Sequence, residues 1–240
     1  MLAVLARIPA RVGFKGAWSF LYTEAAPKPR IGHEVDRLLA LANGAPGVYP
    51  PQLRPTAEDA AVASAFVDGG RPFVALAPGS IWGSKRWPYY AELARRLADR
   101  IAVVVIGGPD DVGLGEEIAA AVGRSGGRAG NACGKLTLRQ SAALIGRAQV
   151  LVTNDSAPLH LATAMGTPIV ALFGPTVTEF GFGPLREGDV ALGRAELLCR
   201  PCSSHGPPSC PLGHHRCMRD LAVDTVTLAI EELGALRRRN

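Results

Sequence analysis

Short apolar runs alternate with stretches of helical periodicity from residue 73 onward. The apolar runs predict buried strands, whereas apolar residues spaced three and four apart predict amphipathic helices. The expected strands cover residues 73–78, 101–108, 149–154 and 168–174, with a weaker run at 128–132. The expected helices cover residues 89–100, 113–124, 137–148 and 157–166.

This alternation of strands and helices is typical of an α/β domain. Strands that are apolar throughout are covered on both faces, because each helical crossover lays its helix over a sheet of parallel strands. We therefore predict a doubly wound parallel sheet over about residues 73–193. Ligands of such sheets bind beyond the carboxyl ends of the strands, so the loops at 79–88, 107–112 and 154–158 should converge on one crevice.

The two flanks of this region differ from it in composition. Residues 1–56 are rich in proline and contain one plausible helix at 34–42, too little for a core of their own. Residues 194–221 form an insert rich in Cys, His and Pro, and a closing helix is expected at 223–239. The remainder, 57–240, is expected to form the main domain.

Composition and charge restrict the class of protein. Apolar residues make up 48% of the chain, and the formal net charge of +5 is spread along it without a basic stripe, so nucleic acid is not an expected partner. The longest apolar run, residues 101–106, is far shorter than a membrane span, and the start lacks the features of a secretory signal. We expect a cytoplasmic protein. Its five cysteines are an odd number, which argues against a disulfide framework.

The loop PGSIWGSKRWP at residues 78–88 could cradle a diphosphate. Its glycines let the backbone approach a ligand, Ser80 offers a hydroxyl, and Lys85 places positive charge beside a helix N-terminus. The alternative is a solvated loop in which Trp82 and Trp87 only pack.

The segment TNDSAPLHLA at residues 153–162 is more specific. Asp155 and Ser156 follow a strand and are expected to cap the next helix, with Pro158 in its first turn. His160 lies one turn beyond Ser156 on the same face, within reach of the same ligand. The alternative is an ordinary N-cap followed by a core histidine.

Several common signatures are absent or incomplete. GNACGKLT at residues 130–137 resembles a P-loop, but its glycines are too close together and Lys135 is followed by Leu136 rather than Ser or Thr. The first strand is not followed by GxGxxG, and the chain has no GxSxG or HExxH. Nicotinamide, hydrolase and metalloprotease chemistry therefore lack support.

Four cysteines are crowded into the insert, at Cys199, Cys202, Cys210 and Cys217. The Cys-x2-Cys start is a common zinc half-site, but the second half, with six residues between its cysteines, is irregular. We expect reduced, metal-free cysteines packed among proline-rich turns, with a structural zinc as the alternative.

Five motifs occur in an order that resembles a known family: PGSIWGSKRWP, VVVIGGPDD, NACGKLTL, VTNDSAPLHLATAMGTPIVALFGPT and CRPCSSHGPPSCPLGHHRCMRDL. Together they resemble the ADP-heptose lipopolysaccharide heptosyltransferases of glycosyltransferase family 9, especially the second-heptose type. The similarity covers roughly residues 73–221. IPARVGFKG and HEVDRLLALA, at 8–16 and 33–42, resemble the last third of that family's N-terminal domain.

The resemblance implies a GT-B fold, in which two Rossmann-like domains face each other and the C-terminal one holds the nucleotide sugar. Ser80 and Lys85 would then contact the donor diphosphate. Asp155, Ser156, Ala157 and His160 would lie on the sugar-diphosphate side, although glycine is more frequent in the family at residue 157. Gly107, Gly108 and Asp110 would line the cleft, and Gly134, Lys135 and Leu136 would lie against the adenine.

The resemblance also implies an inverting transfer without a metal or other cofactor. The donor is ADP-heptose, and the acceptor is lipid A–Kdo or the heptosylated inner core at the cytoplasmic face of the inner membrane. Lys85 and the helix start at Ser156 would stabilise the departing ADP. The family's catalytic carboxylate would lie before Met1, which makes residues 1–56 a remnant of the acceptor-side domain. We therefore expect the chain alone to bind donor and to turn over weakly.

Two alternatives remain open. The chain could be another GT-B nucleotide-sugar enzyme, or a non-catalytic module that binds an ADP-sugar. The identity of the bound nucleotide distinguishes another GT-B enzyme from a heptosyltransferase. Turnover with a lipid A–Kdo acceptor distinguishes a heptosyltransferase from a non-catalytic module.

Overall fold

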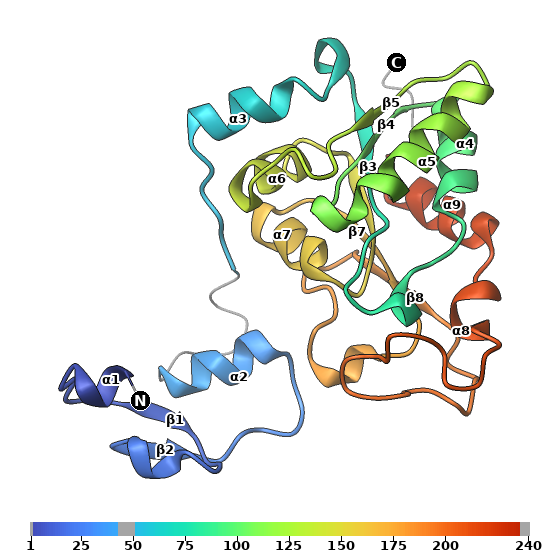
Figure 1. Cartoon of the computed structure of the whole chain (residues 1–240). Helices are drawn as coiled ribbons and strands as arrows, with labels where there is room; N and C mark the ends of the chain where they lie inside the picture. The colour runs from blue at the N-terminus through green and yellow to red at the C-terminus, as the bar shows by residue number, and fades with distance from the viewer. Residues whose placement is uncertain (1, 43–50, 236–240) are drawn as a thin grey trace. The chain divides into compact units, whose positions relative to one another are not determined.

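The computed structural model describes residues 2–42 and 51–235, which belong to two compact units (Figure 1). The smaller unit comprises residues 1–51 together with Glu179–Phe182, and the larger comprises Gln52–Thr178 and the chain from Gly183 onward.

A six-stranded parallel sheet forms the centre of the larger unit, with the order β5-β4-β3-β6-β7-β8. Its strands are β3 (Phe73–Ala77), β4 (Ala102–Val105), β5 (Ala129–Asn131), β6 (Val150–Asn154), β7 (Ile169–Phe173) and β8 (Val190–Gly193). The order runs outward in one direction from β3 to β5 and in the other from β6 to β8, which is the doubly wound arrangement. The predicted fold class is confirmed.

Helices cover both faces of this sheet (Figure 1). One face packs against α4 (Tyr90–Ala98), α5 (Val112–Arg124), α8 (Arg216–Arg219) and α9 (Val223–Glu232), and the other against α3 (Ala57–Ser64), α6 (Leu138–Ile145) and α7 (Ala157–Met165). Alternate strand residues serve the two cores: Val74 and Leu76 belong to the first, and Ala75 belongs to the second. None of the helices in the described ranges is long and apolar enough to cross a membrane.

The strands and helices expected between residues 73 and 174 are all present, with ends that differ by a few residues. Three elements of the larger unit were not predicted: the edge strand β8, the helix α3 and the short helix α8 within the insert. The closing helix α9 stops at Glu232, earlier than expected, and residues 236–239 of the expected range lie outside the described residues.

The smaller unit contains α1 (Leu2–Leu5), β1 (Val12–Phe14), β2 (Glu24–Ala26) and α2 (Glu34–Leu41). β1 and β2 pair in parallel, and α2 matches the helix predicted at 34–42. Within this unit the buried guanidinium of Arg37 donates to the backbone oxygens of Arg30 and Phe180, both at 3.0 Å. These bonds tie the Glu179–Phe182 segment to α2.

Candidate functional site

The candidate site lies where the strand order of the sheet reverses, between β3 and β6. These strands pair in parallel, with Ala77 opposite Thr153 near their carboxyl ends. The loop after β3 and the loop after β6 therefore leave the sheet from the same edge, which is where ligands bind in folds of this type.

A buried ion pair joins these two loops. Lys85 ends the short helix η3 (Gly83–Lys85), and its Nζ donates to Oδ2 of Asp155 at 2.6 Å and to the Asp155 backbone oxygen at 3.1 Å. Lys85 and Asp155 are only 8% and 9% exposed. Removing either partner would leave an uncompensated charge in a site largely shielded from water, so each holds the other in place.

The carboxylate of Asp155 accepts a second hydrogen bond, from the hydroxyl of Thr176. Thr176 follows β7, is 1% exposed, and its Oγ1 donates to the same Oδ2 atom at 2.7 Å. No pattern in the sequence indicates this contact, because the two residues lie on loops that follow different strands.

Asn154 fixes both ends of the loop after β3. Its side chain is fully buried; Nδ2 donates to the Pro78 oxygen at 2.8 Å, and Oδ1 accepts from the Trp87 backbone N–H at 3.2 Å. The hydroxyl of Tyr90 also donates to Oδ1, at 3.3 Å. Trp87 itself is buried and donates from Nε1 to the Leu221 oxygen. For this tryptophan the packing role considered above is therefore observed.

The loop after β4 meets the loop after β3 through Asp111. Its Oδ2 accepts from the Gly108 N–H at 2.9 Å, and a Cβ at Gly79 would clash with its carboxylate. Gly107 is similarly close to Asp111. Asp110, the residue predicted to line the cleft, is exposed on the adjoining turn, so Asp111 is the carboxylate that packs between the two loops.

The start of α7 is only partly as predicted. Ser156 occupies the N-cap position and Pro158 lies in the first turn, as expected. The expected capping by the side chains is wrong: the Ser156 hydroxyl makes no capping hydrogen bond and instead donates to the Asn154 oxygen at 3.4 Å. Ala157 and His160 are exposed on α7, so His160 is not a core histidine.

The turn at Gly134, Lys135 and Leu136 lies beside the loop after β4. Gly134 has a φ of +70° and donates from its backbone to the Gly107 oxygen at 3.0 Å. Its Cα faces Val112 and the backbone of Pro109, where a side chain would not fit. The side chain of Lys135 turns to Asn131 and donates to its backbone oxygen at 2.9 Å.

The Cys-rich insert supports the loop that carries Lys85. The Ser84 hydroxyl donates to the Pro207 backbone oxygen. Nε2 of His215 lies 2.7 Å from the backbone oxygen of Ser84. Pro208 approaches so closely that a Cβ at Gly83 would lie 2.5 Å from its backbone oxygen. The insert therefore packs against the candidate site and supports the loop that carries Lys85.

The cysteines of the insert remain free thiols, as does Cys133. Burial and the neighbouring Cys202 raise the pKa of Cys217 to about 11, and burial with the nearby Asp111 carboxylate does the same for Cys133. Burial also raises the pKa of Cys202. Within residues 2–42 and 51–235, no group of three or more His, Cys, Asp or Glu side chains is arranged to hold a metal ion.

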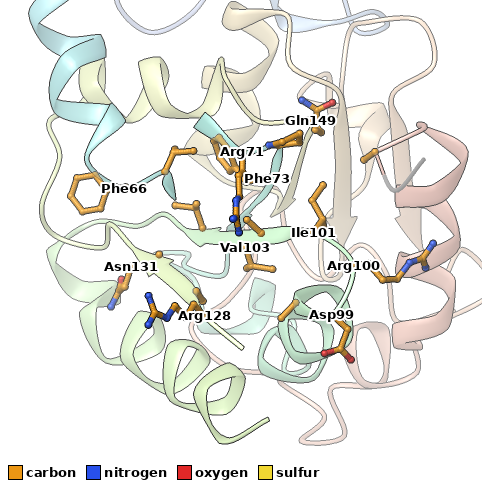
Figure 2. Close-up of a pocket in the computed structure, with 18 of the residues that line it drawn as sticks. Phe66, Arg71, Phe73, Asp99, Arg100, Ile101, Val103, Arg128, Asn131 and Gln149 are labelled. Carbon is orange, nitrogen blue, oxygen red and sulfur yellow. The ribbon is translucent and has the colours of Figure 1, made fainter. Parts of the chain in front are cut away.

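A hollow in the larger unit lies mostly away from these residues, although Lys135 is among the residues that line it. It has a volume of about 1340 Å³ and surrounds the amino-terminal residues of β3 and β4, Phe73 and Ala102. Figure 2 shows Phe66, Arg71 and Arg128 around it. The buried charges and the converging loops lie instead at the opposite, carboxyl ends of β3 and β4, and we assign the site on that chemistry.

The profile of glycosyltransferase family 9 (heptosyltransferase) matches residues 1–210. The chain is 32% identical to lipooligosaccharide heptosyltransferase 2 of Campylobacter jejuni over 174 residues, which is 70% of this chain and 54% of that protein. It is also 32% identical to lipopolysaccharide heptosyltransferase 2 of Salmonella typhimurium over 233 residues, 82% of this chain and 67% of that protein. The chain thus spans about half to two thirds of the length of these relatives.

Among solved structures, ADP-heptose lipopolysaccharide heptosyltransferase II of Escherichia coli matches with a TM-score of 0.79 and 27% identity. The match covers 97% of this chain and 72% of the other. It therefore includes both units, each of which has a counterpart in that protein.

Proposed function

Because the chain belongs to glycosyltransferase family 9, the heptosyltransferases, we propose that it binds ADP-heptose and takes part in transferring the heptose to the inner core of lipopolysaccharide. The donor site is the edge formed by the loops after β3, β4 and β6. The similar protein of Escherichia coli, named for ADP-heptose, supports this choice of donor.

The observation that carries the proposal is the buried pair of Lys85 and Asp155 at the switch point of the sheet. A lysine held beside a carboxylate can pass its hydrogen bonds to an incoming diphosphate, which is a stronger anionic partner. The start of α7 lies directly after Asp155, and a helix N-terminus favours negative charge. Both features suit a sugar diphosphate.

These groups would act mainly on the leaving group. As the bond between the anomeric carbon and the diphosphate breaks, negative charge grows on the departing ADP. Lys85 and the N-terminus of α7 would stabilise that charge, and a preorganised site does so without reorganising during the reaction. Ser80, Gly107, Gly108, Asp110, Gly134, Lys135, Leu136, Ser156, Ala157 and His160 complete the proposed donor-binding set.

Glu34 is poorly suited to act as the base that deprotonates the acceptor. Burial alone would raise the pKa of its carboxyl, but hydrogen bonds from Lys28 and Arg37 outweigh burial and lower the pKa. A carboxylate held by two cations is a weaker base. We propose that another carboxylate of the acceptor-side domain performs this step.

The proposed acceptor is lipid A–Kdo or the heptosylated inner core, met at the cytoplasmic face of the inner membrane. The names of the Campylobacter and Salmonella relatives support a lipooligosaccharide or lipopolysaccharide acceptor.

The test measures nucleotide preference and transfer together. The purified chain is titrated with ADP, UDP and GDP, and is then incubated with ADP-heptose and each of the two acceptors. Preference for ADP with measurable transfer supports the proposal. Preference for UDP or GDP would make the chain a different nucleotide-sugar protein, and ADP binding with no transfer to either acceptor would indicate a binding module.

A further inference from the structure

Thr176 is buried just after β7, and both its side chain and its backbone make hydrogen bonds. Its hydroxyl donates to Oδ2 of Asp155 at 2.7 Å, and its backbone oxygen accepts from Nη2 of Arg200 at 2.8 Å. Because Thr176 is 1% exposed and makes both hydrogen bonds, its side chain has almost no freedom to rotate away from Asp155.

Arg200 anchors the whole segment that carries Thr176. Its guanidinium donates to the backbone oxygens of Phe173, Gly174 and Thr176, and the Cys202 N–H donates to the Pro175 oxygen at 2.8 Å. The insert thus binds four consecutive backbone oxygens. This bonding holds in place the backbone that carries the Thr176 hydroxyl.

The hydroxyl shares its acceptor atom with the ammonium of Lys85. Both donate to Oδ2 of Asp155, the ammonium at 2.6 Å and the hydroxyl at 2.7 Å. When Lys85 turns toward a diphosphate, the carboxylate loses part of its stabilisation in a site that water hardly reaches. A buried carboxylate without a donor is costly, so a second fixed donor lowers the cost of that exchange.

We propose that Thr176, held in place by Arg200, is a positioning residue for the donor: its hydroxyl keeps Asp155 fixed and bonded while Lys85 moves its hydrogen bonds to the diphosphate. This inference rests on the proposed donor site. It also assigns a role to the Cys-rich insert, whose Arg200 reaches the donor site through Thr176.

The test is calorimetric titration of ADP into the full 240-residue chain and its variants. Thr176→Val keeps the shape but loses the hydroxyl, and we expect it to weaken ADP binding about tenfold. Thr176→Ser retains a hydroxyl and should stay within about threefold of wild type. Thr176→Ala replaces the valine variant if that variant does not fold.

A third comparison shows whether Thr176 acts through Asp155. In an Asp155→Ala background, Thr176→Val should have no further effect on ADP affinity, because the acceptor of its hydrogen bond is gone. The proposal is overturned if Thr176→Val binds ADP as tightly as wild type, if Thr176→Ser is as weak as Thr176→Val, or if the two losses simply add. Failure of the wild-type chain to bind ADP would instead overturn the proposed donor site.

Discussion

The ammonium of Lys85 lies 2.6 Å from the carboxylate of Asp155, although the two residues are 70 positions apart in the sequence. The pair connects the loop after β3 to the loop after β6, the two central strands of the sheet. It is also the point on which Thr176 and, through Arg200, the Cys-rich insert converge. The binding of a donor there would therefore depend on residues from four separate parts of the chain.

Replacing Asn154 should loosen the loop that carries Lys85. Asn154→Ala removes the side-chain hydrogen bonds to Pro78, Gly79, Trp87 and Tyr90 and leaves buried polar groups without partners. We expect the free energy of unfolding to fall by about 1–3 kcal/mol, measured by urea denaturation, with weaker ADP binding. Ser125→Ala, at an exposed helix end, is the control and should stay within about 0.5 kcal/mol of wild type. Unchanged stability of Asn154→Ala would contradict this role.

Two glycine substitutions should have opposite effects. At Gly83 a Cβ would lie 2.5 Å from the Pro208 backbone oxygen, so Gly83→Ala must displace the insert from the loop. We expect a loss of about 1–3 kcal/mol in the free energy of unfolding and weaker ADP binding. Gly123 on α5 has nothing within 4 Å of the same position, and Gly123→Ala should stabilise the chain by about 0.5–1 kcal/mol. Thermal unfolding of both variants checks the pair, and a neutral Gly83→Ala would show that the insert does not support the loop.

The sequence was sufficient to predict most strands of the sheet and the loops that follow their carboxyl ends. Apolar runs such as residues 73–77 are buried on both faces, so pattern and structure agree there. β8 was missed because its residues alternate between half-buried and exposed at the sheet edge, which leaves a short and weak signal. α3 could have been found from Thr56 and Asp59, which form a capping box at its start.

The contacts that complete the site could not be predicted in the same way. Lys85 and Asp155 were both selected, but their pairing depends on which strands are neighbours. Thr176 and Arg200 lie within two of the five motifs, but nothing in those motifs relates them to Asp155, and only the fold brings them to Asp155 and to one another. Asn154 did leave a signal, since a polar side chain ends an otherwise apolar strand.

Alkaline pH should destabilise the chain through two buried thiols. Cys133 and Cys217 have pKa values raised to about 11 from an ordinary 9.0, so between these values the unfolded chain binds fewer protons than the folded one. Their contribution to stability is therefore complete below about pH 9 and is lost as the pH rises toward about 11. The loss is at most about 2–3 kcal/mol for each thiol.

Urea denaturation at a series of pH values checks this prediction, with a Cys133→Ala, Cys217→Ala double variant as the control. The wild-type free energy of unfolding should fall more steeply over that range than the variant's. Parallel curves for the two proteins would mean that the thiols titrate alike in the folded and unfolded states.

The most direct measurement is calorimetric titration of ADP, at one fixed salt concentration, into wild type and Lys85→Ala. Lys85 supplies the cation for the diphosphate, so its loss should weaken ADP binding by about 1.5–3 kcal/mol, roughly 10- to 150-fold. Arg95→Ala removes one positive charge from an exposed position on α4 and should bind ADP as wild type does. Equal ADP affinity of Lys85→Ala and wild type would contradict the assignment of the donor site to the edge of β3 and β6.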